Sequence, residues 1–126
     1  MKNENIFTKK SFAFAVQTVK TVQQIQEVKR EFILTKQYLR SGTAIGALIR
    51  EAQNAESKAD FIHKLAISQK ECDETIYWID LLKATDYIND STHLSLKNNA
   101  EELLRLIRSS IITTKQKYKS LPINKS

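Results

Sequence analysis

The scarcity of chain-breaking residues constrains this fold more than any other feature of the sequence. The 126 residues include only two glycines and one proline, whereas average usage is roughly 7% and 5%. β-Strands are joined by turns, and turns draw on glycine, proline, asparagine and aspartate at defined positions. The sequence therefore predicts an all-α protein, and its length is that of one domain.

Apolar residues recur at helical spacing in four segments. The first two helices are expected over about residues 9–28 and 31–54. The turn between them, near Lys29 and Arg30, contains neither glycine nor proline. The expected core stripes are Phe12, Val16, Val19, Val22 and Ile25 in the first helix, and Leu34, Tyr38, Ile45, Leu48 and Ala52 in the second.

The third helix is expected to end near Thr85, and Ser57 with Asp60 resembles a capping box at its start. The fourth is expected over about residues 92–120, because Pro122 prevents continuation. Short connections between amphipathic helices favour an antiparallel up-down four-helix bundle over residues 8–120, between tails at 1–7 and 121–126. The expected seams are Ile62, Leu65, Gln69, Cys72, Ile76 and Ile79 in the third helix, and Leu96, Ala100, Leu103, Ile107 and Ser110 in the fourth.

The third and fourth helices carry more apolar residues than one seam requires. Trp78 lies outside the third helix seam, and Leu104 and Ile111 begin a second stripe on the fourth. Surplus apolar stripes favour self-association, with these residues at the contact. The alternative is a thick core within a single chain.

The two glycines lie four residues apart inside the second helix. Each costs about 1 kcal/mol relative to alanine in a helix interior. We expect Gly42 and Gly46 to allow the close approach of another helix, and the alternative is a local kink near Ser41.

Charge is unevenly distributed along the chain. Residues 1–50 hold nine basic and three acidic residues, which gives +6; residues 51–104 hold five and eleven, which gives −6; residues 105–126 hold six and none, which gives +6. Basic ends that fold together would attract a polyanion, whereas the alternative is attraction between basic and acidic parts of one bundle. The candidate nucleic-acid-binding residues are Lys9, Lys10, Lys20, Arg40, Arg50, Arg105, Arg108, Lys115, Lys117 and Lys119.

Other functional classes find little support. Asp60 and His63 give the nearest match to the Glu-x-x-His motif of di-metal bundles, once only and with too short an acid. Cys72 is the single cysteine, which excludes an intrachain disulfide and a cysteine-based zinc site. Glu71 and Glu74 are interpreted as partners of Arg40 or Arg50 rather than as an acid–base pair. We therefore expect a cytoplasmic protein with no catalytic residue, cofactor, small-molecule substrate or membrane span.

Three blocks of sequence, in order, carry a family resemblance. They are residues 37–52 (QYLRSGTAIGALIREA), 57–62 (SKADFI) and 70–79 (KECDETIYWI), and the opening residues 4–6 and 10–15 also fit. The chain resembles the 23S rRNA intervening-sequence protein family along most of its length.

The resemblance implies a small bacterial four-helix bundle that assembles into a homopentameric barrel and has no known catalytic residues. A related branch, the accessory variability protein of diversity-generating retroelements, is a basic pentamer that binds nucleic acid and a reverse transcriptase. Ala44 and Leu48 stand where the family commonly has serine and asparagine. The leading hypothesis is a non-enzymatic oligomer that binds RNA or DNA, with copies of itself, nucleic acid and a reverse transcriptase as candidate partners. The alternative is a structural or protein-interaction module.

Overall fold

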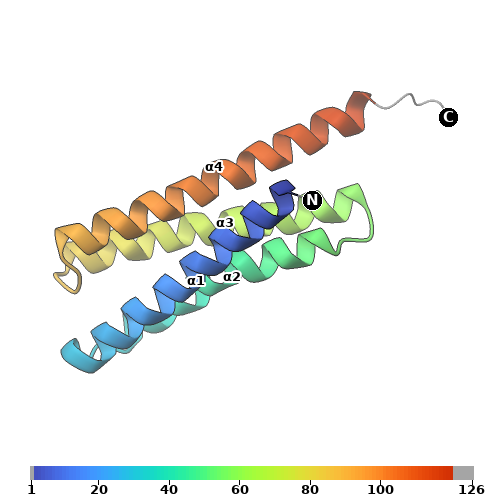
Figure 1. Ribbon diagram of the computed structural model, residues 1–126. Coiled ribbons are helices and arrows are strands. Elements are labelled where there is room, and N and C mark those ends of the chain that lie inside the picture. Colours follow the sequence, from blue (N-terminus) through green and yellow to red (C-terminus); the bar gives the residue numbers. More distant parts are fainter. Residues whose placement is uncertain (1, 121–126) are drawn as a thin grey trace.

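The chain forms four helices joined by short connections (Figure 1). The structure, a computed structural model, describes residues 2–120, with side chains from Ile6 to Lys117. The helices are α1 (Lys2–Lys29), α2 (Ile33–Gln53), α3 (Lys58–Ala84) and α4 (Asp90–Ser120). No strand occurs among the described residues, so the predicted all-α class is confirmed.

Local contacts explain where the helices begin and end without glycine. The Glu31 carboxylate accepts hydrogen bonds from the first backbone N–H groups of α2, those of Ile33, Leu34 and Thr35, at 2.9–3.0 Å. At the start of α3 the Ser57 hydroxyl accepts from the Asp60 N–H at 3.0 Å, as the predicted cap requires. Residues Arg30 and Asp86 end α1 and α3 with positive φ angles of 57° and 66°, the conformation that glycine usually supplies.

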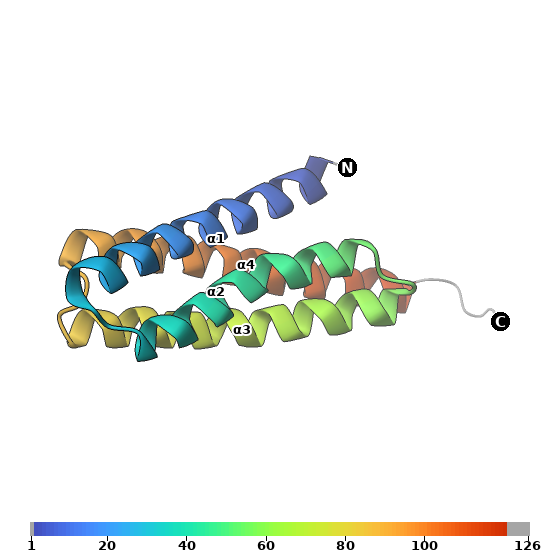
Figure 2. The same ribbon diagram turned by 90° about the horizontal axis from the view of Figure 1, so that it is seen from below.

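Consecutive helices pack side by side, and α1 packs more extensively against α2 than against α4. Figure 2 shows α1 inclined relative to the other three helices. A core runs through all four helices, and its fully buried side chains include Tyr38, Ile45, Ile49, Leu65, Ile79, Leu82, Leu96, Leu103 and Ile107.

The core stripe expected for α1 is partly wrong. Val22 and Ile25 are buried, but Phe12, Val16 and Val19 are 61%, 38% and 36% exposed. Their expected place is taken by the buried residues Ser11, Phe14 and Thr18. At Ser11 and Thr18 the physical reason is the short distance to α2, which leaves room only for small side chains opposite Gly46 and Gly42.

The ends of the bundle also differ from expectation. Residues 2–7, expected as a tail, continue α1, and Phe7 packs against the core. Helix α4 begins at Asp90, two residues earlier than expected. The expected C-terminal tail, residues 121–126, lies outside the described residues.

Candidate nucleic-acid interface

The C-terminal half of α4 presents a row of basic side chains. Arg105, Arg108, Ile112 and Lys115 are all exposed and are spaced by three, four and three residues. Since each helical residue turns the chain by about 100°, these positions share one face. We call Arg105, Arg108 and Lys115 the α4 basic stripe. Lys119 continues the spacing, but its side chain lies outside the described residues.

Lys117 lies on a different side of α4 from this stripe. It lines a cleft of about 460 Å³ between α4 and the start of α1, together with Ile6, Phe7 and Leu106. Arg105, Arg108 and Lys115 therefore share one surface, and Lys117 faces a different one.

The stripe is largely free of compensating charge. Arg108 approaches the Asp73 carboxylate of α3 at 4.0 Å, a marginal distance for an ion pair. Arg105 and Lys115 form no ion pair within the part of the chain that the structure describes.

The basic residues of α1 and α2 do not join the stripe. Lys10 forms an ion pair with Glu102 of α4 at 3.1 Å. Its positive charge is therefore compensated at the boundary between α1 and α4. Lys9 and Lys20 are exposed on another side of α1, and Arg50 borders a groove between α1 and α2. A single positive field across α1 and α4, which the charge pattern suggests, is therefore not formed within one chain.

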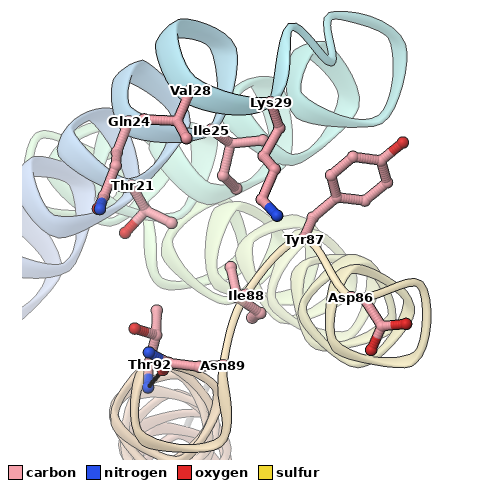
Figure 3. Close-up of a pocket in the computed structure, with 10 residues that line it drawn as sticks. All are labelled: Thr21, Gln24, Ile25, Val28, Lys29, Asp86, Tyr87, Ile88, Asn89 and Thr92. Carbon is pink, nitrogen blue, oxygen red and sulfur yellow. Dashed lines mark hydrogen bonds between the residues drawn. The ribbon is translucent and has the colours of Figure 1, made fainter.

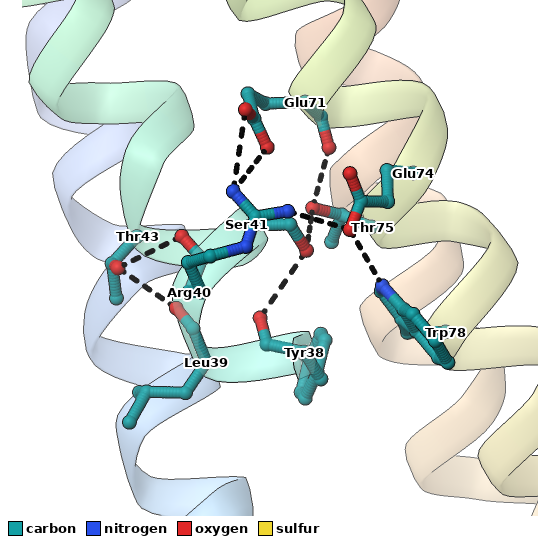
Figure 4. Close-up of polar contacts among 9 residues, drawn as sticks. All are labelled: Tyr38, Leu39, Arg40, Ser41, Thr43, Glu71, Glu74, Thr75 and Trp78. Atoms are coloured by element: carbon teal, nitrogen blue, oxygen red, sulfur yellow. Dashed lines mark hydrogen bonds and ion pairs between the residues drawn. The ribbon is translucent and has the colours of Figure 1, made fainter. Parts of the chain in front are cut away.

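Arg40 belongs to an interhelical network rather than to an open basic surface (Figure 4). Its guanidinium donates to Glu71 at 3.1 Å and to Glu74 at 2.6 Å. The Trp78 indole N–H donates to the same Glu74 carboxylate at 3.0 Å. Both interactions, that of Trp78 first, lower the pKa of Glu74 below its ordinary value of 4.5. The interpretation of the two glutamates as partners of an arginine is confirmed for Arg40.

The two glycines face α1 at its small residues. A Cβ atom on Gly42 would lie 2.8 Å from the Thr18 Cγ2 atom, and one on Gly46 would lie 3.3 Å from the Ser11 carbonyl oxygen. Both positions are helical, with no positive φ angle. Close helix approach, rather than a kink, accounts for both glycines.

The residues expected at an assembly contact are mostly used inside the chain. Leu104 is buried, and Ile111 and Trp78 are half-buried against the core. The surplus stripes thus contribute to a thick core. Exposed apolar side chains lie elsewhere and include Phe12, Val16 and Val19 on α1, Ile33 on α2, Tyr77 on α3, and Leu94 and Ile112 on α4.

The structure offers little that could hold a metal or perform catalysis. No group of three or more potential metal ligands occurs among the described residues. Burial raises the pKa of the Cys72 thiol to about 12, so the nucleophilic thiolate is disfavoured. His93 and Lys97 both contact Asp80, at 2.8 and 3.2 Å, in a half-exposed cluster between α3 and α4.

A cavity of about 430 Å³ lies between the end of α1 and the α3–α4 connection (Figure 3). Ile25 and Ile88 line it, and Lys29 extends from α1 toward Tyr87. The side chain of Asp86 points away from Lys29. The lining contains no histidine or cysteine. Among the described residues, no helix has the length and apolar character needed to cross a membrane.

These features define a class: a small four-helix protein with charged and apolar outer surfaces and no metal-ligand cluster among its described residues. The model of the family described as 23S rRNA-intervening sequence protein matches residues 3–109. The chain belongs to this family, which confirms the resemblance found in the sequence blocks.

A similar solved structure is that of a protein with unknown function from the S23 ribosomal protein family of Bacteroides thetaiotaomicron VPI-5482. It is 45% identical, the match covers 86% of this chain and 97% of that one, and the TM-score is 0.85. No curated protein matches the chain. The family match ends at residue 109, so Lys115 lies beyond it.

Proposed function

We propose that this chain is a non-catalytic, antiparallel up-down four-helix bundle that assembles into a homo-oligomer and binds RNA or DNA through the α4 basic stripe. The observation that carries the nucleic-acid part is the alignment of Arg105, Arg108 and Lys115 on one exposed face. Phosphate contacts from such side chains release counterions and supply affinity without reading sequence.

Assembly would strengthen a weak surface of this kind. Each copy contributes three stripe residues, and repetition around an oligomer raises avidity without new contacts. The pentamer implied by the family resemblance would have a mass near five times 14.5 kDa. Light scattering coupled to gel filtration measures this mass directly, and a monomer at micromolar concentration would contradict the oligomer.

The nucleic-acid proposal is tested with a triple variant, Arg105→Gln, Arg108→Gln and Lys115→Gln. We expect weaker binding to single-stranded RNA and duplex DNA alike. The slope of log affinity against log salt should flatten by ~0.7–0.9 for each phosphate that the variant no longer neutralises. Fluorescence anisotropy at several salt concentrations gives both quantities.

The matched control removes the same charge from other exposed positions, by Lys36→Gln, Lys58→Gln and Lys70→Gln. If net charge alone governs binding, the two triple variants weaken it equally. If the stripe variant keeps the parent's affinity and slope, α4 is not the binding surface. A parent that binds neither nucleic acid at 50 mM salt would leave the protein-interaction module as the function.

A further inference from the structure

The connection between α1 and α2 contains a residue in an unusual backbone conformation. Arg30 has a φ angle of 57°, in the left-handed region that glycine and asparagine adopt far more readily than arginine does. Glycine at this position would end α1 without the steric cost. Asp86 shares the conformation, but a short polar side chain tolerates it. Such strain concentrates at functional sites, so the Arg30 guanidinium is a candidate functional group.

An exposed aromatic ring lies beside this arginine. Phe32 precedes the first residue of α2 and is 48% exposed, although phenylalanine is among the side chains most often buried. The Arg30 guanidinium lies over its ring, 5.4 Å from the ring centroid. Proteins hold an unpaired nucleotide with these two parts, an aromatic ring on which the base stacks and a cation for its phosphate.

A cleft of about 670 Å³ opens next to the ring. Lys20, Arg30 and Phe32 line it together with three glutamines and Glu27. Amide and carboxylate side chains are the groups that hydrogen-bond the edges of bases. Gln26 is engaged with the first turn of α2, whereas the other two glutamines are exposed. The lining thus offers polar partners for a base as well as charge for a phosphate.

The positive charges at the cleft are not cancelled by other parts of the chain. Neither Lys20 nor Arg30 forms an ion pair among the residues that the structure describes. The Glu31 carboxylate, next to Arg30 in the sequence, is turned to the first N–H groups of α2 at 2.9–3.0 Å. Glu27 is the one acid in the lining, so two cations face a single carboxylate.

We infer that the α1–α2 turn, residues 30–32, binds an unpaired nucleotide of a single strand, with the base stacked on the Phe32 ring and the phosphate bound by Arg30 and Lys20. This inference rests on the proposed nucleic-acid binding and adds to it a preference for unpaired strands. The α4 basic stripe contacts only phosphates, which a duplex also carries. A base that is paired and stacked within a duplex has no free face for an aromatic side chain.

The variant Phe32→Leu tests the stacking, because it removes the ring and keeps an apolar side chain before α2. We expect its affinity for an adenine RNA strand of about 20 nucleotides to fall about fivefold or more, as loss of one stacked base does. Its affinity for a duplex, and for a strand of equal length that lacks bases, should stay that of the parent. The slope of log affinity against log salt should also stay unchanged, since no phosphate contact is lost.

Two further variants isolate the ring. Ile33→Ala changes the neighbouring side chain, which is 77% exposed and has no ring, and it should leave all three affinities unchanged. Phe32→Trp enlarges the stacking surface and should bind the adenine strand at least as tightly as the parent. Its indole fluorescence should be quenched by the adenine strand and not by the strand without bases. The parent, with Trp78 as its single tryptophan, gives the background.

The variant Arg30→Gly separates binding from folding. Glycine adopts the left-handed conformation freely, so this variant should melt no lower than the parent by circular dichroism, although it loses the contact with Phe32. Its affinity for the adenine strand should fall, and the salt slope should flatten by ~0.7 for the phosphate no longer neutralised. The charge-matched control is Lys58→Gln, exposed at the opposite end of the bundle (Figure 2), which should keep the parent's affinity.

The inference is overturned if Phe32→Leu binds the adenine strand as the parent does, or if it weakens binding to the duplex and the strand without bases equally. It is also overturned if Arg30→Gly melts well below the parent and keeps the parent's affinity, because the contact with Phe32 then serves only the fold. If only the triple variant at Arg105, Arg108 and Lys115 weakens binding, the α4 basic stripe stands and the turn does not bind. A parent that binds no strand at 50 mM salt would overturn this inference together with the proposed function.

Discussion

Helix α1 meets its two neighbours in different ways. Toward α2 it presents Ser11 and Thr18, which lie against Gly46 and Gly42. The Thr18 hydroxyl donates to the buried Tyr38 hydroxyl at 3.3 Å. Toward α4 buried Phe14 lies near Leu103, and the boundary also contains long polar side chains at exposed positions, such as the Lys10–Glu102 ion pair at 3.1 Å. Small residues on both partners allow close approach, whereas long polar ones hold helices apart.

The boundary between α1 and α4 is incompletely filled. Clefts of about 170 and 460 Å³ lie between α1 and α4. Buried packing contributes far more stability than exposed polar contacts. We therefore expect α1 to be held mainly by α2, and substitutions at the two boundaries to have very different costs.

The largest effect is expected for Gly42→Leu. The new Cβ would lie 2.8 Å from the Thr18 Cγ2 atom before the rest of the side chain is considered. Overpacking of this kind costs about 1–3 kcal/mol. Urea unfolding followed by circular dichroism measures this loss, and Gly46→Leu should destabilise the chain in the same way.

Alanine variants provide the matched control, because they add only the Cβ atom. At Gly42 the clash with buried Thr18 outweighs the roughly 1 kcal/mol gained in helix propensity. At Gly46 the nearest atom, the Ser11 carbonyl oxygen, would be 3.3 Å away, so a shift of a few tenths of an ångström suffices. Gly42→Ala should therefore be the less stable of the two. Equal stabilities, or Leu variants that melt like the parent, would show that the glycine contact is not the tight boundary.

A smaller effect is expected on the far side of α2, where Glu74 receives hydrogen bonds from Trp78 and Arg40. Its folded-state pKa lies below 4.5, so it contributes stability above its unfolded pKa and loses that contribution as the pH falls through the folded value. Since Glu74 is partly exposed, the contribution is below about 1 kcal/mol. Glu74→Gln should lower stability at pH 7, and its difference from the parent should shrink between pH 5 and pH 3.

The control for this measurement is Glu56→Gln, which removes an exposed carboxylate outside the Arg40 network. Thermal melting across the pH range follows all three proteins. A difference between Glu74→Gln and the parent that stays constant down to pH 3 would assign the effect to packing against Trp78 rather than to charge.

The sequence predicted α3 far better than α1. The heptad positions Leu65, Cys72 and Ile79 are fully buried as expected. The other expected seam residues, Ile62, Gln69 and Ile76, are half-buried, and none of the six is exposed. On α1 the residues at 12, 16 and 19 compete with a second face that contains Ser11 and Thr18. Which of the two faces of α1 is buried depends on the neighbouring helix α2, and α2 presents two glycines there.

The sequence likewise predicted only part of the candidate interface. Counting charges located the excess of basic residues at 105–126 and suggested an arginine partner for Glu71 and Glu74. It did not separate Arg105, Arg108 and Lys115 from Lys117, because that distinction depends on how α4 is rotated against its neighbours. The sequence did not predict that Leu94 is exposed, for the same reason, since burial is a property of the packed bundle.

The smallest effect is expected for Glu102→Gln at the boundary between α1 and α4. The side chains of Lys10 and Glu102 are 44% and 43% exposed, so solvent and salt screen their attraction. Exposed ion pairs contribute about 0–1 kcal/mol, and we expect a loss of no more than about 0.5 kcal/mol by urea unfolding. Raising the salt to 1 M should remove even this difference, because the screening length falls to about 3 Å. A loss comparable to that of Gly42→Leu, persisting at 1 M salt, would show that α4 holds α1 as firmly as α2 does.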